Sequence, residues 1–149
     1  MTTILDQEKV KALAEFLEVE PEEITEGQYD DNTLSCDGAE YLVLDEKDAD
    51  AKAREEIEYS LWAFNADFII QHCKNFDAMD NSEYQSALKS LRYTQEQCCE
   101  NANGLVKALI DDMDEFFDDA IMADGRGHFI SRYDGEENEM NGFYIYRVN

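Results

Sequence analysis

Carboxylates dominate the side chains of this sequence that could take part in chemistry. The 149 residues contain 36 Asp and Glu against 12 Lys and Arg, a formal net charge of −24 at pH 7. A small domain needs a net charge of only about 2 to 8 for solubility. Such a surface repels nucleic acids, anionic lipid headgroups and acidic metabolites. The charge therefore excludes these ligands and favours the basic surface of another protein as the binding partner.

The densest group of acids lies between residues 111 and 119, and no base stands between Lys107 and Arg126. Side chains three or four positions apart on a helix lie about 5 to 6 Å from each other, and phosphates advance about 3.4 Å per nucleotide along a DNA strand. A row of such carboxylates can therefore imitate a row of phosphates. The plainer interpretation is a solvated helix face, although such faces usually interleave bases. The candidate phosphate-mimicking residues are Asp111, Asp112, Glu115, Asp118 and Asp119, extended by Glu22, Glu23, Asp30, Asp31, Glu55, Glu56 and Glu58.

Metal-binding motifs are weak. The acidic stretches 45–50 and 77–83 lack the glycine and the glutamate that an EF-hand loop needs at its sixth and twelfth positions. His72, Cys73 and the thiol pair at 98–99 lack the spacing of a zinc site. We therefore expect no bound metal, and we expect free, mostly buried thiols.

One group near the C-terminus resembles an active site more closely. His128 follows a glycine-rich turn, with Asp124, Arg126 and Asp134 nearby in sequence. No nucleophile elbow, phosphate-binding glycine loop or metal motif accompanies them. A turn followed by a histidine that opens a strand is the simpler interpretation. We expect no enzymatic activity and no cofactor.

The first third of the chain predicts a helix and then a hairpin. Asp6 is a good N-cap for a helix over 7–19, whose apolar residues recur at helical spacing. Asp37-Gly38 predicts a type I′ turn between strands at 33–36 and 40–44. The second strand is almost wholly apolar, which indicates a position in the interior of a sheet.

The middle of the chain is predicted to be helical. Asp45 caps a long helix that Asn65 interrupts, and a separate helix follows over 66–73. Ser82 and Gln85 form a capping box for the next helix. Apolar residues from 105 to 121 keep a strong helical register, so we expect one continuous helix to about Met122. The residues expected in the core are Leu61, Trp62, Phe68, Leu91, Leu105, Leu109, Ile110, Phe116, Phe117 and Ile121.

The tail predicts a second hairpin, with strands at 128–131 and 143–148 around the acidic loop 134–142. The elements together predict an α+β fold with about five helices and two hairpins, which could share one small antiparallel sheet. No linker divides the chain, so we expect a single acidic domain over residues 1–149. No signal peptide or membrane-spanning run is present, which favours a cytoplasmic protein without a membrane partner.

The acid surplus is concentrated toward the two ends of the chain. Residues 1–58 carry a net charge of −14, residues 59–110 carry −2, and residues 111–149 carry −8. Chain ends often lie close together in a folded domain. We therefore expect the two acidic segments to form one negative face.

Four phrases of the sequence resemble a family of short acidic proteins encoded by bacteriophages and prophages. They are EYLVL at 40–44, LWAFN at 61–65, DGRGHF at 124–129 and YDGEENE at 133–139. This resemblance implies a phage setting but no activity or site residues. The chain is also similar, in size and charge only, to the acidic antirestriction and anti-CRISPR proteins of phages, several of which imitate DNA.

These observations favour a phage inhibitor that imitates nucleic-acid charge and blocks a DNA-binding defence or DNA-processing enzyme in the host cytoplasm. Its partner would be a nucleic-acid-binding protein, and a homodimer stays open as its own oligomeric state. The alternative is a phage interaction module that binds a host protein through an apolar patch, which exposure of Trp62, Phe64 or Tyr144 would favour. An enzyme that uses residues 124–134 and a halophilic origin of the charge are weaker alternatives.

Overall fold

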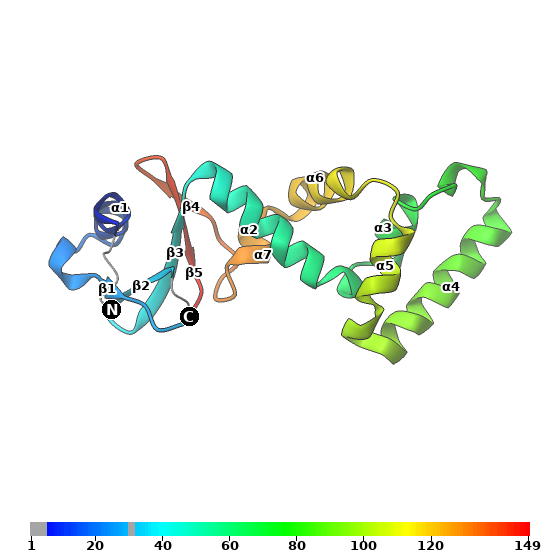
Figure 1. Cartoon of the computed structure of the whole chain (residues 1–149), viewed down its shortest axis with the longest axis horizontal. Helices are drawn as coiled ribbons and strands as arrows, with labels where there is room; N and C mark the ends of the chain where they lie inside the picture. Colours follow the sequence, from blue (N-terminus) through cyan, green and yellow to red (C-terminus); the bar gives the residue numbers. More distant parts are fainter. Residues whose placement is uncertain (1–5, 30–31) are drawn as a thin grey trace. The chain divides into compact units, whose positions relative to one another are not determined.

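The computed structural model describes residues 6–29 and 32–149, and it confirms the α+β class (Figure 1). The chain divides into two compact units. Unit 1 comprises residues 1–53 and 124–149, and unit 2 comprises residues 54–123. The first division falls within helix α2 (Glu46–Tyr59), and the second falls at the end of helix α6 (Met113–Asp124). The single domain expected over the whole chain stays a prediction.

Unit 1 is built on an antiparallel sheet whose described strands follow the order β1-β2-β3-β5-β4. The first predicted hairpin and a C-terminal hairpin, whose first strand differs from the prediction, therefore share one sheet. Every residue of β3 is buried, as expected for a strand in the sheet interior. At the turn before it, Asp37 and Gly38 have φ angles of 51° and 83°, the positive values that a type I′ turn requires. The strands are β1 (Thr25–Glu26), β2 (Thr33–Cys36), β3 (Ala39–Leu44), β4 (Asn138–Met140) and β5 (Phe143–Arg147).

Helix α1 (Gln7–Leu17) lies against this sheet (Figure 1). The Asp6 carboxylate accepts hydrogen bonds from the backbone N–H groups of Glu8 and Lys9, so the predicted N-cap is confirmed. The helix buries Val10, Leu13 and Ala14 in a core that includes residues of β2, β3 and β5. The short 3₁₀ helix η1 (Pro21–Glu23) follows it.

The strand predicted at 128–131 is wrong. Residues Arg126–Ile130 form the short helix α7, and β4 is the partner of β5. The turn of this hairpin is Asn141-Gly142, with φ angles of 56° and 82°. Asn-Gly is the preferred type I′ turn pair, so residues 141–142 carry the local signal for this hairpin.

Unit 2 is helical. The long helix expected to reach Asn65 ends earlier, at Tyr59, and η2 (Leu61–Ala63) follows it. The separate helix expected after Asn65 is present as α3 (Ala66–Gln71), and Asn65 is its N-cap. The capping box of the next helix is wrong by two residues, because Asp80 and Glu83 make the reciprocal contacts. The remaining elements are η3 (Phe76–Ala78), α4 (Asn81–Cys98), η4 (Cys99–Ala102), α5 (Asn103–Leu109) and α6.

The continuous helix expected from residue 105 to Met122 is interrupted. Helix α5 ends at Leu109 and α6 begins at Met113, because Ile110 has extended backbone and pairs with Cys73 in an isolated antiparallel bridge. Half of the expected core is fully buried. Leu61, Leu91, Ile110, Phe116 and Phe117 are buried, Trp62, Phe68 and Ile121 are partly buried, and Leu105 and Leu109 are exposed.

The four thiols are free, but the expectation that most are buried is wrong. Cys36 is buried and Cys73 is partly buried, whereas Cys98 and Cys99 are exposed at the end of α4. Burial raises the pKa of both Cys36 and Cys73. Within the described ranges, no helix has the length and apolar character needed to cross a membrane.

Candidate functional site

The connection between α5 and α6 positions the acids that begin the candidate row. Ile110 is held by its bridge to Cys73, and the backbone N–H of Asp111 donates to the carbonyl of His72 at 2.9 Å. Asp112 then caps α6, because its carboxylate accepts a hydrogen bond from the N–H of Glu115 at 3.2 Å. Asp111 and Asp112 therefore lie before the helix, and their spacing is that of a loop rather than of a helix face.

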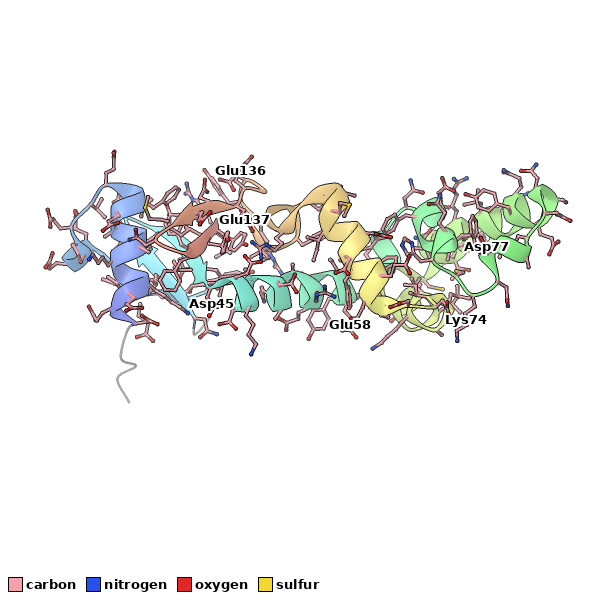
Figure 2. All side chains as sticks on the ribbon, turned by 90° about the horizontal axis from the view of Figure 1, so that it is seen from above. Asp45, Glu58, Lys74, Asp77, Glu136 and Glu137 are labelled. Carbon is pink, nitrogen blue, oxygen red and sulfur yellow. The ribbon has the colours of Figure 1, made fainter. Side chains whose placement is uncertain are left out.

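Three of the predicted acids line one hollow of about 460 Å³ in unit 2. Asp111, Asp112 and Glu115 line it together with Asp77 of η3, and Asp77 is labelled in Figure 2. All four residues are exposed, and none forms an ion pair with any residue that the structure describes. We call this site the acidic hollow. Its remaining lining is Gln71, His72, Cys73, Asn75, Phe76 and Ala78.

The later acids of the row are compensated, which overturns the expectation that this segment lacks a nearby base. Arg54 of α2 pairs with Asp118 in a short contact, and it lies 3.5 Å from Asp114. Its guanidinium also stands 5.4 Å from the centre of the Phe117 ring. This cation comes from a distant part of the sequence, so the spacing of charges along the row could not reveal it.

Asp119 has a second internal partner. Its carboxylate lies 2.7 Å from Nε2 of His72, while Nδ1 of His72 lies 2.8 Å from the carbonyl oxygen of Phe68. Both ring nitrogens of His72 therefore lie within hydrogen-bond distance of an oxygen atom. The rings of Phe68 and Phe116 pack against His72 with centroids 4.7 and 5.1 Å away. Asp119 thus holds the core in place and is a poor candidate for a partner contact.

The predicted extensions of the row do not gather at the hollow. Glu58 pairs with Lys107 at 2.5 Å, and Glu55 and Glu56 lie one turn or less before it on α2. Glu22 and Glu23 belong to η1 of unit 1, where the Glu23 carboxylate accepts from the N–H of Glu20. Asp30 and Asp31 lie outside the described residues. Asp77 is the contributor that the sequence did not indicate, because its acidic stretch suggested only a weak calcium motif.

The hollow suits an organic cation from a partner. Four carboxylates and two side-chain amides provide acceptors for the N–H groups of lysine or arginine, and charge-assisted hydrogen bonds of this kind are the stronger ones. Within the part of the chain that the structure describes, no three His, Cys, Asp or Glu side chains are grouped so that they could hold one metal ion.

The residues around His128 form a structural network in unit 1. Arg126 pairs with Glu46 and Glu137, each at 2.8 to 2.9 Å, and stacks on the ring of Tyr144. The hydrogen bond from Arg126 lowers the pKa of Glu46. The Ser131 hydroxyl donates to Asp134, while His128 is exposed and contacts the ring of Phe129. Arg126 is thus engaged in ion pairs and Asp134 in hydrogen bonds, whereas Asp124 and His128 are exposed.

Comparison of the chain with protein-family models, with curated proteins and with solved structures finds no match. Functional inference therefore depends on the chemistry of the acidic hollow and on the charge of the chain.

Proposed function

We propose that this protein is an acidic inhibitor of the phage type, which imitates the charge of nucleic acid and blocks a DNA-binding defence or DNA-processing enzyme of a bacterial host. It would act in the host cytoplasm by binding, as antirestriction and anti-CRISPR proteins do, without catalysis or a cofactor. The observation that carries the proposal is the group of four exposed carboxylates around the acidic hollow, with no cationic partner among the described residues.

The contrast within one short segment supports this choice. Asp118 is paired with Arg54 and Asp119 contacts the ring of His72, whereas Asp111, Asp112 and Glu115 have no ion-pair partner among the described residues. Grouped like charges oppose folding, and they attract a basic surface and accelerate its association. A groove that binds DNA phosphates supplies such a surface in the form of lysine and arginine side chains. We therefore assign the phosphate-mimicking role, predicted for a larger set of acids, to Asp77, Asp111, Asp112 and Glu115.

The three residues that would have favoured an apolar-patch module are each partly buried. Trp62 and Phe64 belong to unit 2, where the ring of Phe64 contacts those of Phe68 and Phe116. Tyr144 supports the Arg126 guanidinium in unit 1. These side chains serve packing, so the carboxylates are the better candidates for the primary contact.

The proposal is tested by capture from a nuclease-treated bacterial lysate at low and high salt. We expect a nucleic-acid-binding enzyme to be retained at low salt and released as salt rises, because salt screens the attraction between exposed charges. A variant with Asp77→Asn, Asp111→Asn, Asp112→Asn and Glu115→Gln should lose this protein. Asparagine retains the capping ability of residue 112, so the fold should be unaffected.

The control removes four charges elsewhere, through Glu18→Gln, Glu26→Gln, Glu96→Gln and Glu100→Gln. All four are exposed, and the control has the same net charge as the hollow variant. It should retain the captured enzyme. Equal retention by both variants, or capture only of proteins that bind no nucleic acid, would contradict the proposed function.

A further inference from the structure

An apolar groove of about 390 Å³ lies beside the acidic hollow in unit 2. Its walls come from α3, α4 and α5, and it is lined chiefly by Ile70, Cys73, Leu91, Leu105, Ala108 and Leu109. Leu105 is 48% exposed and Leu109 is 38% exposed. These two leucines are four positions apart on α5, while Val106 between them is fully buried in the core. Helix α5 therefore presents apolar side chains to the core and also to the surface.

The groove and the hollow share one boundary. Cys73 lines both, and its bridge to Ile110 separates them. On one side of the bridge the N–H of Lys74 donates to the carbonyl of Leu109, and both residues line the groove. On the other side the N–H of Asp111 donates to the carbonyl of His72, and both residues line the hollow. Leu109 and Asp111, which only Ile110 separates, thus place an apolar side chain on one side of this boundary and a carboxylate on the other.

We propose that the apolar groove and the acidic hollow form one docking surface for an amphipathic helix of a basic partner protein. Apolar side chains of that helix would enter the groove between Leu105 and Leu109, and a flanking lysine or arginine would reach Asp111 and Glu115. The inference rests on the proposed function, since it specifies which part of a basic partner engages the same site. Docking of an amphipathic helix in an apolar groove is a common mode of recognition.

Leu109 and Asp111 are separated by a single residue, Ile110, whose backbone is extended. Side chains three or four positions apart on a helix lie about 5 to 6 Å from each other. One face of a partner helix can therefore place a leucine in the groove and a basic side chain at the hollow without a break in the helix.

The negative charge of the chain favours a basic helix over a second copy of the chain as the occupant of the groove. Two copies that each carry a charge of −24 repel one another, whereas a helix with basic flanks is attracted. Lys74 stands at the groove rather than at the hollow, so the basic residues of the partner are directed toward Asp111, Asp112, Glu115 and Asp77.

The test uses synthetic peptides of leucine and lysine. The first has leucines at helical spacing with lysines flanking them on the same face, the second has the same composition in scrambled order, and the third is polylysine of equal charge. Binding to the full chain is followed by fluorescence anisotropy. We expect the amphipathic peptide to bind at least about tenfold more tightly than either control, because only it can bury apolar surface in the groove.

Two variants locate the binding. Leu105→Gln with Leu109→Gln should remove the advantage of the amphipathic peptide and leave the affinity for polylysine unchanged. Tyr93→Gln with Met122→Gln changes two exposed apolar residues outside the groove, and it should leave all three affinities unchanged. The leucines are exposed, so the fold should tolerate their replacement, and circular dichroism checks this.

Equal affinity for the amphipathic and scrambled peptides would overturn the inference. It would also be overturned if sedimentation showed a dimer that Leu105→Gln with Leu109→Gln dissociates, because a second copy would then occupy the groove. Neither outcome affects the proposed function, which fails separately if no nucleic-acid-binding enzyme depends on the four carboxylates of the hollow.

Discussion

Single carboxylates have opposite roles in this protein according to their surroundings. Glu40 lies in the middle of the sheet on β3 and is buried, which is uncommon for a glutamate. Its side chain accepts hydrogen bonds from the backbone N–H groups of Gln28 and Tyr29 and so fixes the loop before β2. These contacts, that with Tyr29 first, lower the pKa of Glu40. Asp111 and Glu115, in contrast, are exposed and accept no hydrogen bond from a described cation.

The lowered pKa of Glu40 gives a stability effect with a defined sign. A carboxyl whose pKa is lower in the folded state stabilises the fold above its ordinary pKa, near 4.5, and loses this contribution as the pH falls through the folded value. We expect Glu40→Gln to lower the free energy of unfolding at pH 7, and the difference from wild type should shrink below pH 4.5. Urea unfolding at several pH values measures both. A difference that does not vary with pH would show that the charge of Glu40 is unimportant.

Asp118 and Asp111 provide a second pair for comparison. Asp118→Asn removes the partner of Arg54, so it should destabilise the fold by about 0.2 to 1 kcal/mol, the range for partly exposed ion pairs. Asp111→Asn removes a charge that has no cationic partner among the described residues, so it should be neutral or slightly stabilising because repulsion falls. Urea midpoints of the two variants test this difference. A larger loss of stability for Asp111→Asn than for Asp118→Asn would contradict the assignment of the ion pair to Asp118.

At the scale of elements, the sequence predicted correctly those features that depend on residues adjacent in the chain. The Asp6 cap, the Asp37-Gly38 turn and the buried strand β3 each depend on residues adjacent in sequence, and each is confirmed. The break between α5 and α6 could not be predicted in this way. Apolar periodicity continues across it, and the bridge from Cys73 to Ile110 that imposes it joins segments about 37 positions apart.

The same limit applies to the candidate site. The sequence indicated Asp111, Asp112 and Glu115, but the partners of Asp118 and Asp119 come from α2 and from the end of α3. Asp77 likewise belongs to another element, η3, and lines the hollow through the tertiary fold. Tertiary contacts therefore decided which members of an apparently uniform acidic row are available to a partner.

Close packing of α7 gives a prediction at this scale. A methyl group at Gly127 would lie 2.5 Å from the carbonyl oxygen of Gly135, inside contact distance to backbone that cannot easily move. Gly127→Ala should destabilise the protein by about 1 to 3 kcal/mol. The control is Gly104→Ala on α5, where no atom obstructs the methyl group and helix propensity predicts a gain of about 0.5 to 1 kcal/mol. Thermal unfolding should shift in opposite directions, and a shared direction would contradict the packing of α7.

At the scale of the whole molecule, the acid surplus belongs to both compact units. Unit 1 contains 21 acids and 7 bases, and unit 2 contains 15 acids and 5 bases. The near-neutral middle segment of the sequence therefore does not correspond to a neutral unit. Composition alone favours a basic partner, whereas the choice of the proposed contact residues requires the fold. Under the proposed function, charge provides long-range attraction and the acidic hollow binds basic side chains.

The most direct test of this account measures the affinity of the captured host enzyme for the protein over a series of salt concentrations, with duplex DNA as competitor. We predict that DNA displaces the protein. We also predict that the variant neutralised at Asp77, Asp111, Asp112 and Glu115 binds more weakly, with a flatter dependence of affinity on salt, because fewer charges take part. The control of equal net charge should behave more like the wild type. Simultaneous binding of DNA and protein to the enzyme, or an unchanged affinity and salt slope for the hollow variant, would contradict nucleic-acid mimicry at this site.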